Sequence, residues 1–171
     1  MDLFSGRALF ENAALRMPPI LAGLFGAAGR GYRLRAMEAT VRVKREVLTR
    51  LLEEARGNPA QECCGLLAGR DGVITTLLPA ENAQACATAY EIAPRDLFRL
   101  FRAMRAEGLA HMGIYHSHPG GENAPSQRDI ESAFYPDAAW FIVSPLPDAP
   151  RPVRAFAIRE ARATELKIVA V

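Results

Sequence analysis

The sequence has little of several features that would point to particular classes of protein. Its 171 residues carry a net charge of only +2, from 21 basic and 19 acidic side chains, whereas nucleic-acid-binding domains usually show a stronger and more clustered basic excess. It contains no run of about 18 apolar residues, so we expect no membrane-spanning helix. Its only cysteines are Cys63, Cys64 and Cys86. This odd count, with two cysteines adjacent, argues against a disulfide framework and for a reducing, cytoplasmic location.

The apolar content suits one folded domain with an added N-terminal segment. Half of the residues are apolar, which is enough to build a hydrophobic core at this length. An apolar run at 17–29 lies late, and Asp2 and Glu11 fit poorly with the basic start of a signal peptide. We therefore expect residues 1–36 to be an N-terminal extension, either a loosely ordered arm or an upstream extension of the reading frame. Residues 37–171 are the predicted domain.

Hydrophobic periodicity predicts interleaved strands and helices. Strands are expected at 39–43, 63–69, 72–79, 88–92, 111–115, 139–144, 152–160 and 165–171. Helices are expected at 44–56, from Pro94 to Gly108, and beginning at Ser126. The second and third strands flank Arg70 and Asp71 between two glycines, which is typical of a hairpin. The resulting class is α/β or α+β with a mixed sheet.

Two of the chain's three histidines lie in one short stretch after the strand at 111–115. His116 and His118 are two residues apart, so at the end of a strand they face the same side and can share one metal ion. Gly120 and Gly121 are expected to let the chain turn sharply after them. Ser126 then begins a helix that carries Asp129 in its first turn, where free backbone N–H groups stabilise a carboxylate. Zinc favours nitrogen and carboxylate ligands of this kind.

Each of these signs also has an ordinary structural explanation. Ser126 and Asp129 have the spacing of a simple capping box, and a single pair of histidines is a weak signal, although the combination is less common by chance. A hydrolytic zinc site also needs a base that takes a proton from the attacking water. The candidate is Glu62, which directly precedes an apolar strand. The alternative for Glu62 is a surface position at the start of that strand.

The complete pattern resembles the JAMM signature of the JAB/MPN metalloprotease family. The match runs from His-Ser-His-Pro at 116–119, through five residues to Pro125-Ser126, and through two more to Asp129. The upstream segment "ECCGLLAG" at 62–69 is similar to the glutamate-bearing strand of that family. The resemblance extends from about residue 38 to about residue 160. It is greatest to the short prokaryotic members.

The resemblance implies a fold, a metal and a reaction. The fold is a curved mixed β-sheet flanked by helices, with a cytidine-deaminase-like architecture. His116, His118 and Asp129 correspond to the ligands of one zinc ion, Glu62 to the general acid/base, and Ser126 to a residue that helps to bind the oxyanion. The implied reaction is hydrolysis of the peptide or isopeptide bond after the C-terminal Gly-Gly of a ubiquitin-like protein. In prokaryotes these substrates include sulfur-carrier proteins.

Other functions remain open at this point. Some members of the family are non-catalytic MPN-type protein-interaction modules, although they lack the ligands that are present here. A RadC-like role on DNA is a further alternative, but the chain has no basic patch to support it. The sequence does not contain the His-x-Glu and Pro-Cys-x-x-Cys pattern of zinc deaminases. The identity of the protein substrate and the oligomeric state are left open by the sequence.

Overall fold

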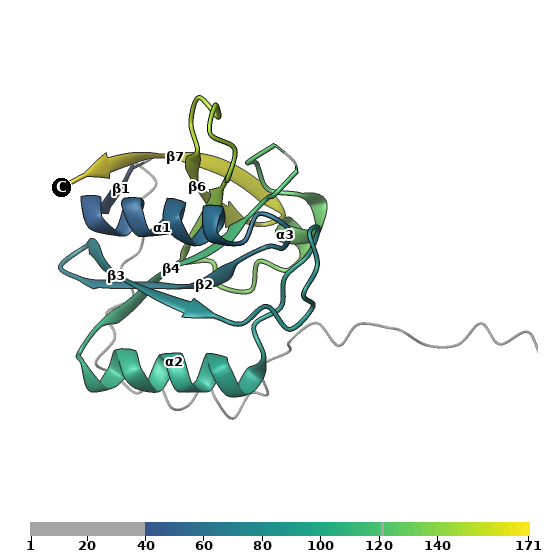
Figure 1. Ribbon diagram of the computed structural model, residues 1–171. Helices are drawn as coiled ribbons and strands as arrows, with labels where there is room; N and C mark the ends of the chain where they lie inside the picture. Colours follow the sequence, from purple (N-terminus) through teal and green to yellow (C-terminus); the bar gives the residue numbers. More distant parts are fainter. Residues whose placement is uncertain (1–39, 121) are drawn as a thin grey trace, which may run out of the picture. The chain divides into compact units, whose positions relative to one another are not determined.

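The structure is a computed structural model that describes residues 40–120 and 122–171 (Figure 1). The N-terminal extension predicted at 1–36 lies outside the described residues. The elements follow one another along the chain as β1 (Thr40–Val43), α1 (Arg45–Gly57), β2 (Cys64–Arg70), β3 (Val73–Ala80), α2 (Pro94–Ala106), β4 (Ala110–Ser117), α3 (Gln127–Glu131), β5 (Ala139–Val143), β6 (Val153–Arg159) and β7 (Arg162–Ala170). Most of these bounds lie within a few residues of the predicted ones.

The strands form one mixed sheet in the order β1-β3-β2-β4-β5-β6-β7. Strand β1 pairs in parallel with both β3 and β7, so the sheet closes on itself. Strands β4 and β5 are also parallel, and the remaining pairs are antiparallel. The predicted mixed α+β class is therefore confirmed. The closure was not predicted, because it depends on pairing between the first and last strands.

Two hydrophobic clusters lie on opposite faces of the central strands. Helix α1 contacts β3, β5 and β6, so it lies inside the curl of the sheet (Figure 1). Its buried residues Val47, Leu51 and Ala55 belong to the cluster on that side. Helix α2 covers the other face of β3 and β4 and contributes Leu100 and Met104 to the second cluster. This arrangement leaves the ends of β2 and β4 between the two helical layers.

The predicted hairpin is present between β2 and β3. Asp71 and Gly72 at its tip have φ values of 52° and 75°, which is the left-handed pair of a tight two-residue turn. At Gly69 the register of β2 shifts, and a Cβ atom would lie 1.8 Å from the carbonyl oxygen of Val73. Only glycine fits there, so the bulge and the turn explain both glycines that flank the corner.

The strand predicted at 88–92 is wrong. This segment contains only an isolated bridge between Asn82 and Ile92. The amide nitrogen of the Asn82 side chain donates to the carbonyl oxygen of Ala89 at 2.9 Å, and its Oδ1 accepts from the backbone N–H of Glu91 at 3.1 Å. A side chain therefore satisfies backbone groups that would otherwise need a neighbouring strand.

Two expectations from composition can be compared with the structure. The three cysteines are free, and Cys64 is buried in the hydrophobic cluster under α2. The prediction that no disulfide framework forms is thus confirmed. In the described part of the chain, no helix is both long enough and apolar enough to cross a membrane.

His111, the third histidine, is expected to make stability depend on pH. Its ring lies edge-on to Phe101 and Tyr135, and burial lowers its pKa to about 4, against a hydrogen bond with the Gly113 carbonyl. Because the folded-state pKa is below the ordinary value of 6.5, this stabilisation is complete above that value and is lost as the pH falls towards the folded-state pKa. Wild type should therefore become less stable when the pH falls from about 7.5 to about 4.5. In the variant His111→Phe this decrease in the free energy of unfolding should be smaller by about 2–3 kcal/mol.

Urea unfolding of the metal-free proteins at the two pH values measures this difference. Excess chelator in both samples removes any contribution from metal binding. Equal losses of unfolding free energy in the two proteins would contradict the prediction.

Candidate metal centre

The register between β2 and β4 sets the geometry of the candidate site. Cys64 lies opposite His116 in the antiparallel ladder, and the pairing continues with a 3.0 Å bond from the Ser117 N–H to the Cys63 carbonyl. Counting one step further places Glu62 opposite His118. Residues directly opposite one another in an antiparallel pair share a face of the sheet. The strand order therefore brings Glu62 and the two histidines to one side of the same strand ends.

Asp129 reaches this place from the first turn of α3. Ser126 caps the helix: its Oγ accepts from the Asp129 N–H at 3.2 Å, while Asp129 Oδ2 accepts from both the N–H and the Oγ of Ser126 at 2.7 Å. The predicted capping box is thus present. It fixes the carboxylate at the helix N-terminus, where Asp129 is buried.

Three side chains converge as the sequence predicted. The Nε2 atoms of His116 and His118 are 2.9 Å apart, His116 Nε2 is 3.3 Å from Asp129 Oδ1, and His118 Nε2 is 3.5 Å from Asp129 Oδ2. Ligand atoms about 2.0–2.1 Å from a tetrahedral zinc ion lie roughly 3.3–3.4 Å from one another. Both distances to Asp129 are close to that spacing, and the distance between the two nitrogens is shorter.

The hydrogen bonds around the rings fix one histidine with its Nε2 lone pair facing the centre. His118 Nδ1 lies 2.9 Å from the carbonyl oxygen of Glu122, and because a carbonyl only accepts, Nδ1 carries the hydrogen. His116 is fully buried and stacks on Tyr90 at a ring separation of 4.5 Å. Its Nδ1 has no hydrogen-bond partner among the described residues. Two imidazole nitrogens 2.9 Å apart beside a carboxylate, one of them with its lone pair towards the other, form a donor set that fits a metal.

The electrostatics of the cluster also suit a metal. Burial alone would raise the pKa of Asp129, but hydrogen bonds from the two imidazoles and Ser126 outweigh it and hold the pKa far below its usual range. Burial lowers the pKa of His116. Burial opposes charge on His118, but its bonds with Asp129 and with the Glu122 carbonyl together raise its pKa. An ionised Asp129 and a neutral His116 are the protonation states that bind metals.

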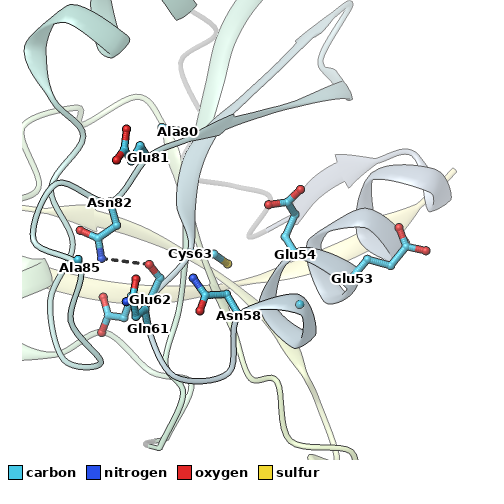
Figure 2. A pocket seen from close by; sticks show the side chains of 11 residues that line it. Glu53, Glu54, Asn58, Gln61, Glu62, Cys63, Ala80, Glu81, Asn82 and Ala85 are labelled. Atoms are coloured by element: carbon cyan, nitrogen blue, oxygen red, sulfur yellow. Dashed lines mark hydrogen bonds between the residues drawn. The ribbon is translucent and has the colours of Figure 1, made fainter.

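Glu62 is buried beside this cluster, with 4% of its surface exposed. Burial raises its pKa to about 7; the charge of His118 acts against this shift and that of Asp129 adds to it. Its backbone is fixed at both ends, because its N–H donates to the Cys86 carbonyl at 2.9 Å and its carbonyl accepts from Asn82 Nδ2 at 3.0 Å (Figure 2). A buried carboxyl group that titrates near neutral pH is suited to proton transfer.

Asn82 is the site residue that sequence reasoning missed. It ties Glu62 to the segment after β3 and also organises residues 82–91, where we expected a strand. Its identity alone gave no signal, since asparagine is common in loops of every kind. The chain bends at residues 119 and 120, after the histidines, as expected. Gly120 does not have a positive φ, and Gly121 lies outside the described residues.

A pocket of about 530 Å³ opens next to Glu62 rather than over the two histidines. Figure 2 shows Glu53 and Glu54 on one side of it and Glu81 and Asn82 on the other. Strand alternation turns the Cys63 side chain towards α1 and the Glu62 side chain towards His118. The pocket and the metal centre are therefore neighbouring features that meet at the backbone of residues 62 and 63.

Comparison with known proteins identifies the family. Residues 44–159 match the family described as prokaryotic homologs of the JAB domain. This chain belongs to that family. The matched region contains Glu62 and all three residues of the cluster, so the geometry described above lies within the family domain.

Relatives of known name are similar over most of their own length. The probable TtuB-protein conjugate cleaving protease of Thermus thermophilus is 36% identical over 118 residues, which cover 68% of this chain and 76% of the relative. The desampylase of Haloferax volcanii is 35% identical over 102 residues, or 58% and 73% of the two chains. The CysO-cysteine peptidase of Mycobacterium tuberculosis is 29% identical over 125 residues, or 72% and 86%.

Solved structures agree with this fold. A protein of Desulfitobacterium hafniense, solved in solution, superposes with a TM-score of 0.70 at 28% identity and covers 77% of this chain and 93% of its own. A structure reported as a metalloprotease-like zinc site of the JAMM type has a TM-score of 0.50 at 20% identity, over 76% of this chain and 98% of its own. The second likeness concerns the fold alone.

Removing the hydroxyl of Ser126 is expected to destabilise the protein. The variant Ser126→Ala loses the cap on α3 and the hydroxyl bond to Asp129, so the free energy of unfolding of the metal-free protein should fall by about 1 kcal/mol. The control is Ser132→Ala at the other end of α3, where the cap bonds come from the backbone. It should change stability by less than about 0.5 kcal/mol. Equal losses in the two variants in urea unfolding would contradict a capping role.

Proposed function

We propose that this chain is a zinc-dependent metallopeptidase. Its substrate is the peptide or isopeptide bond after the C-terminal Gly-Gly of a ubiquitin-like or sulfur-carrier protein. The observation that carries the proposal is the convergence of His116, His118 and Asp129 beside the buried Glu62, whose carboxyl group is affected by the charges of His118 and Asp129. The relatives named as a conjugate cleaving protease and a CysO-cysteine peptidase support this class of substrate.

Zinc is the metal that suits two imidazole nitrogens and one carboxylate oxygen, because a catalytic site of this kind keeps a fourth position for water or substrate. When bound, zinc would supply a Lewis acid and make water a better nucleophile at neutral pH. The protein's part is to hold the three ligand side chains in place. Two of them come from the end of one strand and the third from a capped helix, which are rigid supports.

Glu62 is the proposed general base and acid. It accepts a proton from the water that attacks the carbonyl carbon, and it then delivers that proton to the nitrogen of the leaving amine. Its pKa of about 7 in the protein without metal falls when a divalent cation lies nearby, so the carboxylate is ionised at neutral pH. Burial keeps the proton transfer out of bulk water.

Ser126 is the proposed donor to the oxyanion. A correctly placed donor of this kind contributes roughly 3 kcal/mol to transition-state stabilisation. In this structure the Ser126 hydroxyl donates to Asp129 Oδ2 at 2.7 Å, and a hydroxyl has one hydrogen to donate. Its role on the substrate therefore requires the hydroxyl to rotate away from Asp129 during the reaction.

A Gly-Gly tail suits the narrow approach to such a buried site, because it is extended and has no side chains. Strand β3 pairs with β1 only at Val73 and Ile74, so residues 75–80 have no second strand beside them among the described residues. Pro79 in this stretch lacks an N–H, which is typical of an edge. An extended tail could add to this edge as a further strand, and the edge ends beside the segment that holds Glu62.

The proposed location is the reducing cytoplasm, in keeping with three free cysteines. The alternative of a non-catalytic interaction module is not favoured by any observation in the described residues. A non-catalytic module is expected to lack one or more metal ligands. In this chain two histidines, an aspartate and a buried glutamate are present together.

The test is cleavage of a carrier protein that ends in Gly-Gly and is fused to a short reporter peptide. Wild type should release the reporter, and mass spectrometry should place the cut after the second glycine. Glu62→Gln should keep zinc but lower kcat by about 10²–10⁴-fold, because the proton acceptor is lost. His118→Ala should lose zinc, as measured by metal analysis of the purified protein.

The matched control is Glu54→Gln. Glu54 lines the same pocket as Glu62 but belongs to α1 and lies on the opposite side of that pocket from Glu81 and Asn82 (Figure 2). The rate of Glu54→Gln should therefore stay close to that of wild type. Full activity of Glu62→Gln would remove the proposed mechanism. Wild-type protein that contains no zinc after purification in zinc-supplemented medium would favour the interaction module instead.

A further inference from the structure

The loop after His118 is tied to the sheet by a network that the mechanism above does not use. The Glu122 carbonyl holds His118 Nδ1 at 2.9 Å, so the orientation of this ring depends on where the loop lies. The side chain of Glu122 is 84% exposed, and its Oε1 lies 3.9 Å from Arg154 Nη1, an ion pair at the surface. The main chain of the loop, not its side chain, is therefore the contact with the metal centre.

The next residue of the loop is held from two directions by the start of β6. Asn123 Nδ2 donates to the Arg151 carbonyl at 2.5 Å, and Arg154 Nη1 donates to the Asn123 carbonyl at 3.4 Å. Fixing both the side chain and the carbonyl of Asn123 restrains the adjoining peptide plane, which contains the Glu122 carbonyl. Asn123 is thus engaged with Arg151 and with Arg154 of β6.

Arg154 is itself held in one position. Its guanidinium makes two bonds to Glu165 of β7, from Nη2 to Oε2 at 2.7 Å and from Nε to Oε1 at 3.2 Å. It also lies over the ring of Phe156 at 4.9 Å, and its side chain is only 15% exposed. A two-pronged bond to a carboxylate gives arginine a defined geometry that a single surface ion pair does not have.

We infer that Arg154 is a positioning residue for His118. It acts through Asn123 and the Glu122 carbonyl, which together fix the ring orientation and the Nδ1–H tautomer that leave Nε2 free to bind a metal. Groups that orient metal-binding histidines in this way commonly affect affinity without touching the ion. The inference rests on the proposed function, since it assumes that His118 is a metal ligand.

A purely structural role for Arg154 predicts a different outcome. Ion pairs near the surface contribute little to stability, typically less than about 1 kcal/mol. If Arg154 only joined β6 to β7, its removal would change unfolding slightly and leave metal binding unchanged. Metal affinity and stability together therefore separate the two roles.

The experiment compares Arg154→Ala with Arg159→Ala. Arg159 lies on the same strand and also donates to a loop carbonyl, that of Pro136 at 2.9 Å, but this loop does not touch His118 in the described structure. Zinc affinity is measured by competition with a chromophoric chelator, and thermal stability is measured on the metal-free proteins. Arg154→Ala should bind zinc roughly 10-fold more weakly than wild type, at the low end for groups that orient metal ligands, and Arg159→Ala should bind as wild type does.

Two further variants locate the contact. Glu122→Ala keeps the carbonyl and should retain wild-type affinity, whereas Asn123→Ala loses the bond to Arg151 and should weaken zinc binding. Nitrogen-15 NMR of the histidine rings in metal-free protein, recorded at a pH high enough for His118 to be neutral, should show a single Nδ1–H tautomer for His118 in wild type and a mixture in Arg154→Ala. If Arg154→Ala does not fold, Asn123→Ala and its NMR spectrum decide the question.

Wild-type zinc affinity in Arg154→Ala, or an unchanged His118 tautomer in that variant, would overturn the inference. Equal weakening in Arg154→Ala and Arg159→Ala would also overturn it, because the effect would then be general destabilisation of β6. Failure of wild type to bind zinc at all would instead count against the proposed function. The two ideas therefore fail on different measurements.

Discussion

The antiparallel register of β2 against β4 is the constraint on which the candidate site depends. Cys64 lies opposite His116 and Ser117 bonds to the Cys63 carbonyl, so the same register, two residues beyond Cys64, brings Glu62 towards His118. A slip of one residue would turn one set of side chains to the other face. Close packing holds the register. A Cβ atom at Gly65 would lie 2.4 Å from the Leu78 carbonyl and 2.6 Å from the Tyr115 ring, so the strand has no room to slide past its neighbours.

Contacts within the cluster of His116, His118 and Asp129 offset the free-energy cost of burying these polar side chains. A carboxylate and two imidazoles removed from water are unfavourable unless they are paired. Asp129 is bonded by its own helix N-terminus and lies within ion-pair distance of both histidines. Glu62 has no such partner among the described residues, and its raised pKa reflects that difference. The centre thus combines the Asp129 carboxylate, which stays ionised, with the Glu62 carboxyl group, whose pKa is close to neutral pH.

The parts of this arrangement that the sequence predicted are the local ones. Two histidines at a strand end, a serine that caps a helix and an aspartate in its first turn follow from periodicity and capping rules over a few residues. The recognition of the JAB/MPN family and the mixed α+β class were likewise confirmed. Closure of the sheet through β1 and β7 was not predicted, nor was the role of Asn82 in place of a strand at 88–92. Both depend on contacts between residues that local patterns do not connect.

The bond from His118 to the carbonyl of residue 122 has a consequence for which sequence changes this loop tolerates. A main-chain oxygen is supplied by every amino acid, so substitutions at this position leave the acceptor in place. An insertion or deletion of one residue between the second histidine and the capping serine would move that oxygen. For this one contact, the length of the segment therefore matters more than the side chain at residue 122.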